Sequence, residues 1–189
     1  VLDPPKDSKG KPSFIEVSNR SFGEFETAVP KIRSFVKGMK ESKVLSTSKH
    51  FPGYDSWTNS DHQIAFSTSS KDVILKNVEL FKEFADEIPV IMLSSVRFVR
   101  LSNTPAVFNP KITAMAREIS PYTVLLTDDL WGVSLRAWIS GTDKVKGKNY
   151  PSKDFKKLIR TVLWARNDMF MITYPAKAVE MIAYLEWLG

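Results

Sequence analysis

Two short motifs place reactive side chains directly after apolar runs of this sequence. The motif KHFPG contains His50, and the motif TDDL contains Asp128. A carboxylate at such a position can act as a nucleophile or can cap a helix, and an imidazole can transfer a proton or hold a structural hydrogen bond. The chain has two histidines, His50 and His62. Together with Asp61 they could also ligate a metal, but their spacing matches no common metal-ligand pattern, so we expect no metal site.

Four short apolar runs precede the segments that carry these side chains. The runs are KVLSTS at 43–48, PVIMLS at 89–94, TVLLT at 123–127 and DMFMIT at 168–173. They lack clean polar alternation, which is typical of buried parallel strands. Amphipathic stretches with helix-start signals surround the runs at 25–42, 70–86, 109–119, 153–167 and 176–188. This alternation predicts an α/β fold built from parallel βαβ units.

Such units assemble into either a doubly wound sheet or part of a (β/α)₈ barrel. In both architectures ligands bind at the C-terminal ends of the strands, where His50 and Asp128 stand. A complete barrel usually takes about 250 residues. At the observed spacing of the runs, 189 residues are too short for eight strands.

The composition excludes several classes of protein. Hydrophobic residues make up 43% and charged residues 25%, an ordinary globular mixture. No apolar run is long enough to span a membrane, and the polar, proline-rich first residues do not form a signal peptide. The absence of cysteine excludes disulfides, thiolate metal sites and cysteine nucleophiles. Both a cytoplasmic location and a cell-envelope location, after removal of a signal, stay open.

The net charge of +6 favours anionic partners in general. Much of the excess is local, because six lysines fall within residues 143–157. That stretch also contains glycine, proline and asparagine, which predicts a solvated loop that runs into a helix. No nucleic-acid-binding motif accompanies it, so we expect no nucleic-acid partner.

Several motifs occur here in one characteristic order. KHFPG is followed by His62 nine residues after the glycine, then by PA-x-x-NPKI before a helix, and then by TDDL. NRSFG at 19–23, the segment FVKGM at 35–39 and NDM at 167–169 extend the pattern over nearly the whole chain. This order resembles glycoside hydrolase family three, and within it the single-domain bacterial β-N-acetylhexosaminidases.

The resemblance implies a (β/α)₈ barrel that cleaves β-linked sugars with retention, without a cofactor. Asp128 matches the family nucleophile, which forms a covalent glycosyl-enzyme. A carbohydrate is then the partner, and a β-N-acetylglucosaminide from cell-wall fragments is the expected substrate. A β-glucosidase or β-xylosidase of the same family is an alternative. A degenerate, non-catalytic sugar-binding or scaffold protein is another.

The acid/base group of these enzymes resembles an Asp-His dyad on the loop after KHFPG. His62 falls on the histidine, whereas Ser60 stands where the aspartate is expected. A serine cannot supply the carboxylate that orients an imidazole and raises its basicity. Asp61 could take that role after a shift of the loop, although neighbouring side chains in extended backbone point in opposite directions.

Other residues match sugar-binding positions of the family. Lys49 and His50 correspond to the Lys-His pair that hydrogen-bonds sugar hydroxyls, and Arg20 corresponds to an arginine with the same role. Ser95 falls where the family usually has histidine or tyrosine. Trp131, directly after TDDL, could stack on a sugar face or could serve in packing.

The same resemblance assigns residues 1–189 to the C-terminal part of one barrel domain, about strands four or five to eight. KHFPG, TDDL and the final run look like strands five, seven and eight, with Val1 and Leu2 near the end of strand four. The first strands are then expected upstream of Val1. Such a piece would leave an open sheet edge and an incomplete pocket, and its activity alone is in question.

Overall fold

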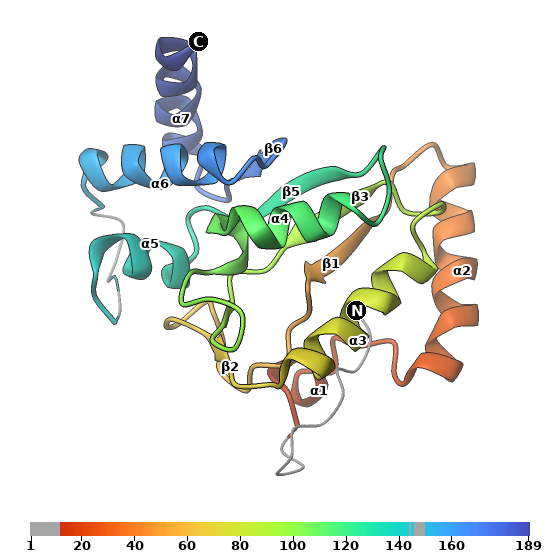
Figure 1. The fold of residues 1–189 in the computed structure, drawn as a ribbon. Helices are drawn as coiled ribbons and strands as arrows, with labels where there is room; N and C mark the ends of the chain where they lie inside the picture. Colours follow the sequence, from red (N-terminus) through yellow and green to blue (C-terminus); the bar gives the residue numbers. More distant parts are fainter. Residues whose placement is uncertain (1–11, 144, 146–149) are drawn as a thin grey trace.

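The structure is a computed structural model that describes residues 12–143, 145 and 150–189 (Figure 1). Its main sheet is parallel, with strand order β1-β3-β5-β6, where β1 is Thr47–Phe51, β3 Val90–Leu93, β5 Val124–Asp129 and β6 Met169–Met171. The order never reverses, whereas a doubly wound sheet reverses at a switch point. The described sheet is therefore singly wound.

The strands β3, β5 and β6 lie at the apolar runs that predicted them. The strand β1 begins later than its apolar run predicts. Residues 43–48 were expected to be strand, but β1 begins at Thr47 and continues through His50. Lys43 has a positive φ of 58°, and the Val44 N–H donates to the carbonyl of Met39. This turn ends the preceding helix and leaves Val44 and Leu45 exposed. The expected strand end at Val1 and Leu2 lies outside the described residues.

All five predicted helices form, with ends within a few residues of those expected. Side chains cap two of them: Ser70 Oγ accepts from Val73 N–H (3.3 Å), and Asn109 Oδ1 accepts from Lys111 N–H (2.9 Å). The bounds are α2 Phe25–Glu41, α3 Lys71–Glu83, α4 Pro110–Arg117, α6 Ser152–Trp164 and α7 Pro175–Leu188. The described part contains no helix that is long and apolar enough to cross a membrane.

Short elements that the sequence patterns did not predict complete the fold. A second, two-stranded parallel sheet joins the loops after β1 and β3. All but one of these elements span two to four residues, too few for a periodic apolar pattern to emerge. They are α1 Phe14–Val17, β2 Phe66–Ser67, β4 Arg97–Phe98, the 3₁₀ helix η1 Ala106–Phe108 and α5 Val133–Ser140.

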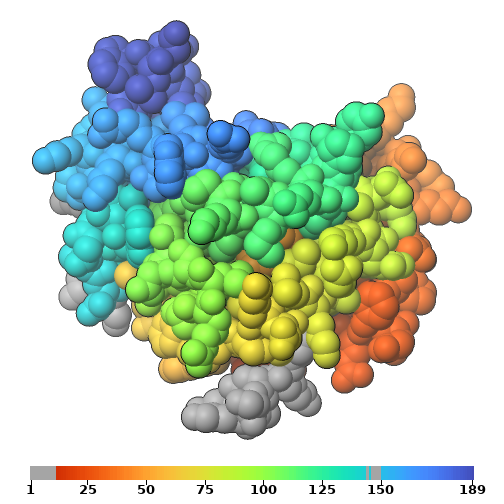
Figure 2. All heavy atoms as spheres, viewed as in Figure 1, coloured from red at the N-terminus to blue at the C-terminus, as the bar shows by residue number. Residues whose placement is uncertain are grey.

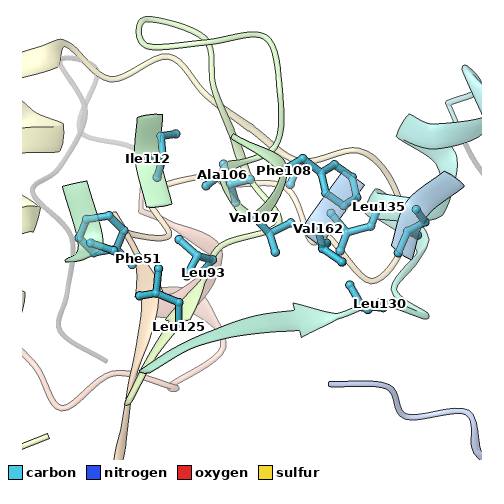
Figure 3. Close-up of a cluster of buried hydrophobic side chains, with 14 of the residues drawn as sticks. Phe51, Leu93, Ala106, Val107, Phe108, Ile112, Leu125, Leu130, Leu135 and Val162 are labelled. Atoms are coloured by element: carbon cyan, nitrogen blue, oxygen red, sulfur yellow. The ribbon is translucent and has the colours of Figure 1, made fainter. Parts of the chain in front are cut away.

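The main core lies between the sheet and the helices that follow its strands. Figure 3 shows Phe51, Leu93 and Leu125 of the strands beside Ile112 of α4, with Phe108 further along the same cluster. These side chains are at most 2% exposed. Burying each contributes about 1.5–3 kcal/mol. The core therefore fixes the strands relative to one another, and with them the C-terminal edge of the sheet.

The two outer strands of the sheet have different surroundings. Beside β1, helices α2 and α3 pack together through a smaller apolar cluster that includes Ile32, Val36 and Phe84. Beside β6, helix α7 projects from the body of the molecule, and α2 lies at the opposite end (Figures 1 and 2). Among the described residues, β1 pairs with β3 alone and β6 with β5 alone.

Candidate active site

The parallel sheet brings residues from three strands to one edge. Lys49 and His50 lie in β1, Ser95 follows β3, and Asp128 is near the end of β5. Because neighbouring parallel strands end on the same side, side chains far apart in the sequence meet there. The structure therefore collects Lys49, His50 and Asp128, together with Ser95, at the edge where the fold class predicts a ligand.

The Asp128 carboxylate is half-buried and held at both oxygens. The hydroxyl of Ser95 donates a hydrogen bond to Oδ2, and the backbone N–H of Asp129 donates to Oδ1 at 2.9 Å. Two hydrogen bonds to the separate oxygens of a carboxylate fix its orientation. This arrangement provides a positioned, anionic oxygen at the end of a strand. The sequence patterns identify Ser95 only as a departure from a family pattern. Its place shortly after a buried strand could have indicated that it belongs to the site.

His50 is buried, and its imidazole is uncharged at neutral pH. Burial lowers the pKa of His50 from 6.5 to about 4, because a charged imidazole loses its hydration there. The negative charge of Asp128 acts in the opposite direction, whereas the cations of Lys49 and Arg20 lower the pKa further. Asp128, Lys49 and Arg20 are thus close enough to act electrostatically on His50. Lys49 is half-buried and Arg20 is exposed.

The His50 ring contacts the ring of Tyr54, with 5.5 Å between the centroids. Its Nδ1 atom is buried and has no hydrogen-bond partner among the described residues. A neutral imidazole has one donor and one acceptor nitrogen. His50 can therefore offer a hydrogen bond to a hydroxylated ligand without the cost of burying a charge.

Tyr54 organises the loop that follows KHFPG. Its hydroxyl accepts from the N–H of Ser60 at 2.9 Å and lies 3.1 Å from both Ser60 Oγ and the carbonyl of Thr58. The carbonyl of Ser60 in turn accepts from the N–H of Ser134 at 3.0 Å. Ser60 is therefore a loop anchor in this structure. Burial raises the pKa of Tyr54, which keeps its hydroxyl protonated as a donor.

Asp61 and His62 are both exposed, at the outer turn of this loop. The N–H of Asp61 donates to Asn59 Oδ1 at 2.8 Å, and the N–H of His62 donates to the Asn59 carbonyl at 3.2 Å. These local bonds stabilise a tight turn. Within the described part of the chain, no hydrogen bond or ion pair joins either side chain to Asp128. The structure thus shows no hydrogen bond or ion pair between His62 and Asp128 among the described residues.

Trp131 lies in an aromatic cluster behind the site. The guanidinium carbon of Arg136 is 4.2 Å from its ring centroid, and the ring of Tyr174 is 4.9 Å away. Tyr150 and Phe155 approach it edge-on at 6.0 and 6.1 Å. These neighbours make the ring a packing residue in this structure, and its contact with a sugar stays a prediction.

Asp129 joins β5 to the segment after β6. Its Oδ1 accepts from the N–H groups of Trp131 (3.0 Å) and Thr173 (2.9 Å), and its Oδ2 accepts from the Thr173 hydroxyl at 2.6 Å. The neighbouring carboxylates therefore have separate surroundings, because Asp129 holds two strand ends together while Asp128 faces Ser95. In the residues that the structure describes, no group of three acidic or histidine side chains is arranged to hold a metal.

Comparisons with known proteins find similar sequences. Residues 10–130 match the model of the glycosyl hydrolase family 3 N-terminal domain. A β-hexosaminidase of Glaesserella parasuis serovar 5 (strain SH0165) is 30% identical over 95 residues, which are 48% of this chain and 28% of that protein. The chain therefore matches less than a third of this curated relative.

Solved structures resemble the fold. Zinc-bound CbsA of Thermotoga neapolitana has a TM-score of 0.76 at 18% identity, over 100% of this chain and 38% of that one. NagZ of Neisseria gonorrhoeae, in complex with N-trifluoroacetyl-D-glucosamine, has a TM-score of 0.67 at 21% identity, over 88% of this chain and 46% of that one. A β-N-acetylhexosaminidase of Beutenbergia cavernae DSM 12333 has a TM-score of 0.66 at 23% identity, over 88% and 47%. This chain thus spans less than half of each of these structures.

Proposed function

The chain belongs to glycosyl hydrolase family 3, and from this premise we propose that it carries the catalytic edge of a retaining exo-β-N-acetylglucosaminidase-like hydrolase. The observation that carries the proposal is the Asp128 carboxylate at the end of β5, which Ser95 and the Asp129 N–H hold at both oxygens. The hexosaminidase names of the similar proteins support the choice of sugar.

In the proposed reaction Asp128 attacks the anomeric carbon of a β-linked sugar. The bond to the leaving oxygen breaks as that oxygen receives a proton, and a covalent glycosyl-enzyme forms. Water then attacks the anomeric carbon from the face that the leaving group occupied, which restores the carboxylate and retains the β configuration. The Ser95 hydroxyl keeps one carboxylate oxygen fixed, so that the other can be directed at the sugar.

The neighbouring polar side chains suit binding of sugar hydroxyls. Lys49 and Arg20 supply cationic donors, and His50 supplies a neutral imidazole whose Nδ1 has no described partner. No organic cofactor or metal is required, because carboxylate, imidazole and water suffice for the reaction.

His62 is the proposed acid/base residue of this mechanism. Its side chain is exposed in the turn after Asn59, so the role requires the loop at 54–62 to close over the bound sugar. Asp61 is the neighbouring residue that carries a carboxylate. The side chain of Ser60 is hydrogen-bonded to the Tyr54 hydroxyl.

We also propose that the sheet is part of a (β/α)₈ barrel, about strands four or five to eight, in one domain over residues 1–189. The singly wound order, the outer strands β1 and β6 without further neighbours among the described residues, and the share of each relative that the chain covers support this. The remaining strands, which are N-terminal in the family arrangement, then come from outside the described sheet.

A glycoside that carries fluorine at C2 or C5 tests the nucleophile, because it slows hydrolysis of the glycosyl-enzyme and allows the adduct to be weighed. With a 2-deoxy-2-fluoro glucoside, and with a 5-fluoro N-acetylglucosaminide because the acetamido group occupies C2 of that sugar, intact mass spectrometry is expected to show one added glycosyl unit on the parent protein and none on Asp128→Asn. Asp72→Asn, which changes an exposed carboxylate of α3, is the matched control and should label like the parent. An adduct that persists in Asp128→Asn would refute the assignment.

A non-catalytic sugar-binding protein is the second candidate. The observation that favours it is the Tyr54–Ser60 contact, which occupies the position where the family pattern has an acid/base carboxylate. In this case neither the parent nor Asp128→Asn forms an adduct or cleaves an aryl β-N-acetylglucosaminide, yet calorimetry detects binding of N-acetylglucosamine. A glucoside or xyloside preference with a trapped adduct would instead indicate a β-glucosidase or β-xylosidase.

A further inference from the structure

A groove lies between helices α6 and α7, the helices that precede and follow β6 in the chain. Its volume is about 700 Å³, and Figure 1 shows α7 rising above α6 there. Lys153, Lys156 and Arg160 of α6 line one wall, and Tyr184 and Trp187 of α7 line the other. None of these residues belongs to the candidate active site. The groove is therefore a second place on the molecule where a ligand can be held.

The α6 wall of the groove is positively charged. Lys153, Lys156 and Arg160 are exposed, and their spacing of three and four residues places them on one face of the helix. Seven residues of α-helix rise about 10 Å, so the three cations form a row of that length. In the part of the chain that the structure describes, none of the three forms an ion pair. The row is therefore available to an anionic ligand.

The carboxylates near this row have other partners. Glu180 lines the groove, but it is paired with Lys177 and accepts a hydrogen bond from Ser152 Oγ at 2.5 Å. Asp154 of α6 accepts from Ser140 Oγ of α5 at 3.1 Å and does not line the groove. The groove thus keeps an excess of positive charge. Such an excess attracts anions, and salt weakens the attraction.

The α7 wall offers an aromatic surface. The rings of Tyr184 and Trp187 are stacked, with 5.6 Å between their centroids and 13° between their planes. Tyr184 is buried, and Lys156 Nζ lies 5.2 Å from its ring centroid, whereas Trp187 is 76% exposed. The buried ring supports the exposed one, so that Trp187 presents a flat apolar surface beside the row of cations. Exposed aromatic side chains of this kind are typical of binding surfaces.

The groove continues toward the candidate active site. Lys177, the partner of Glu180, has its Nζ atom 5.9 Å from the ring centroid of Trp131. Trp131 is the third residue after Asp128. One end of the groove is thus separated by a few side chains from the strand end that carries the proposed nucleophile. This continuity favours a chain of sugars over other anionic molecules as the occupant.

We propose that the groove binds an acidic polysaccharide. Lys153, Lys156 and Arg160 pair with its acidic groups, and Trp187 packs against the apolar face of one sugar ring. The row of cations is about as long as two linked sugar rings, so it can meet acidic groups on neighbouring sugars. Single-stranded nucleic acid is instead held by several rings that stack on successive bases. The inference adds a second site to the proposed function, and it rests on that function for the carbohydrate nature of the ligand.

Binding of polygalacturonate, a polysaccharide with carboxylates on its sugars, tests the inference. Calorimetry at low ionic strength is expected to show that the parent protein binds polygalacturonate and binds neutral dextran about tenfold more weakly or not at all. The double variant Lys156→Gln and Arg160→Gln should weaken the binding of polygalacturonate about tenfold or more. Trp187→Ala should weaken it by a similar factor of about ten.

Matched variants control for net charge and for exposed aromatic surface. The double variant Lys76→Gln and Lys111→Gln removes the same charge from exposed positions of α3 and α4, outside the groove. Tyr122→Ala removes a ring that is 87% exposed and also lies outside the groove. Both should bind polygalacturonate like the parent. Every changed side chain is exposed, so the fold should tolerate the changes, and circular dichroism confirms that each variant is folded.

Each other result would overturn the inference. Absence of binding by the parent, equal binding by the parent and either groove variant, or an equal loss in the double lysine control would show that the groove does not hold the polymer. A single-stranded oligonucleotide, or vesicles with anionic lipid, that bind more tightly and depend on the groove residues would exclude a polysaccharide as the occupant. The readout is binding and not hydrolysis. Polymer binding without a glycosyl adduct would therefore refute the proposed function alone, and an adduct without polymer binding would refute the groove alone.

Discussion

Acidification is expected to destabilise this protein through His50. The folded state holds its imidazole buried and neutral with a pKa of about 4, whereas the ordinary value is 6.5. Between these values the unfolded chain binds a proton that the folded chain excludes. The free energy of unfolding therefore has its full value above pH 6.5 and falls by about 1.4 kcal/mol per pH unit below it. By pH 4 the loss from this one residue amounts to about 3 kcal/mol.

Urea unfolding, followed by tryptophan fluorescence at several pH values from 7.5 to 4, measures this loss. Carboxylates also titrate near pH 4, so the comparison uses His50→Gln, which keeps a polar side chain and removes the titrating group. The difference in unfolding free energy between parent and variant should change by about 3 kcal/mol across the range. His62→Gln alters the exposed histidine and is the matched control, and it should keep the His50-dependent slope.

Parallel pH profiles of the parent and His50→Gln would refute the reasoning, because burial would then not exclude the proton. Nuclear magnetic resonance gives a direct check. The chain has two histidines, so the Cε1 proton of His50 can be assigned by its loss in His50→Gln. Its shift should titrate with a midpoint near pH 4, and a midpoint near 6.5 would contradict the burial of a neutral ring.

Three further changes test the packing around the site by urea unfolding. Phe51→Ala removes a fully buried ring that packs edge-on against Phe81 at 5.0 Å, and should cost about 3–5 kcal/mol; a loss below 1 kcal/mol would argue against this core. Asn109→Ala removes the N-cap of α4 and should cost about 1 kcal/mol, whereas Asn109→Asp should retain most of the stability. Gly53→Ala should cost more than about 1 kcal/mol, because φ is +150° and the new Cβ would lie 2.6 Å from Asn77 Nδ2; an unchanged midpoint would contradict this geometry.

Local signals account for how well the elements could be predicted. Asn109 followed by proline identifies the start of α4, and the apolar runs at 89–94 and 123–127 identify β3 and β5, because capping and burial patterns are properties of neighbouring residues. The predicted start of β1 is wrong. Val44 and Leu45 are apolar, but they follow the turn at the end of α2, where the Val44 N–H donates to the carbonyl of Met39. The brief elements β2, β4 and η1 depend on contacts with distant segments, and no local pattern predicts them.

The sequence by itself predicted Lys49, His50 and Asp128 for the candidate site, but it did not predict the role of Ser95. Lys49, His50 and Asp128 follow or end strands, and parallel strands bring such positions to one edge whatever the details of packing. The tertiary structure alone decided what these residues can do. The neutral state of His50 and the contact between Ser95 and Asp128 both depend on groups that are far apart in the chain. Burial and hydrogen bonding between distant segments arise only when the strands and loops pack, so no local pattern could have specified them.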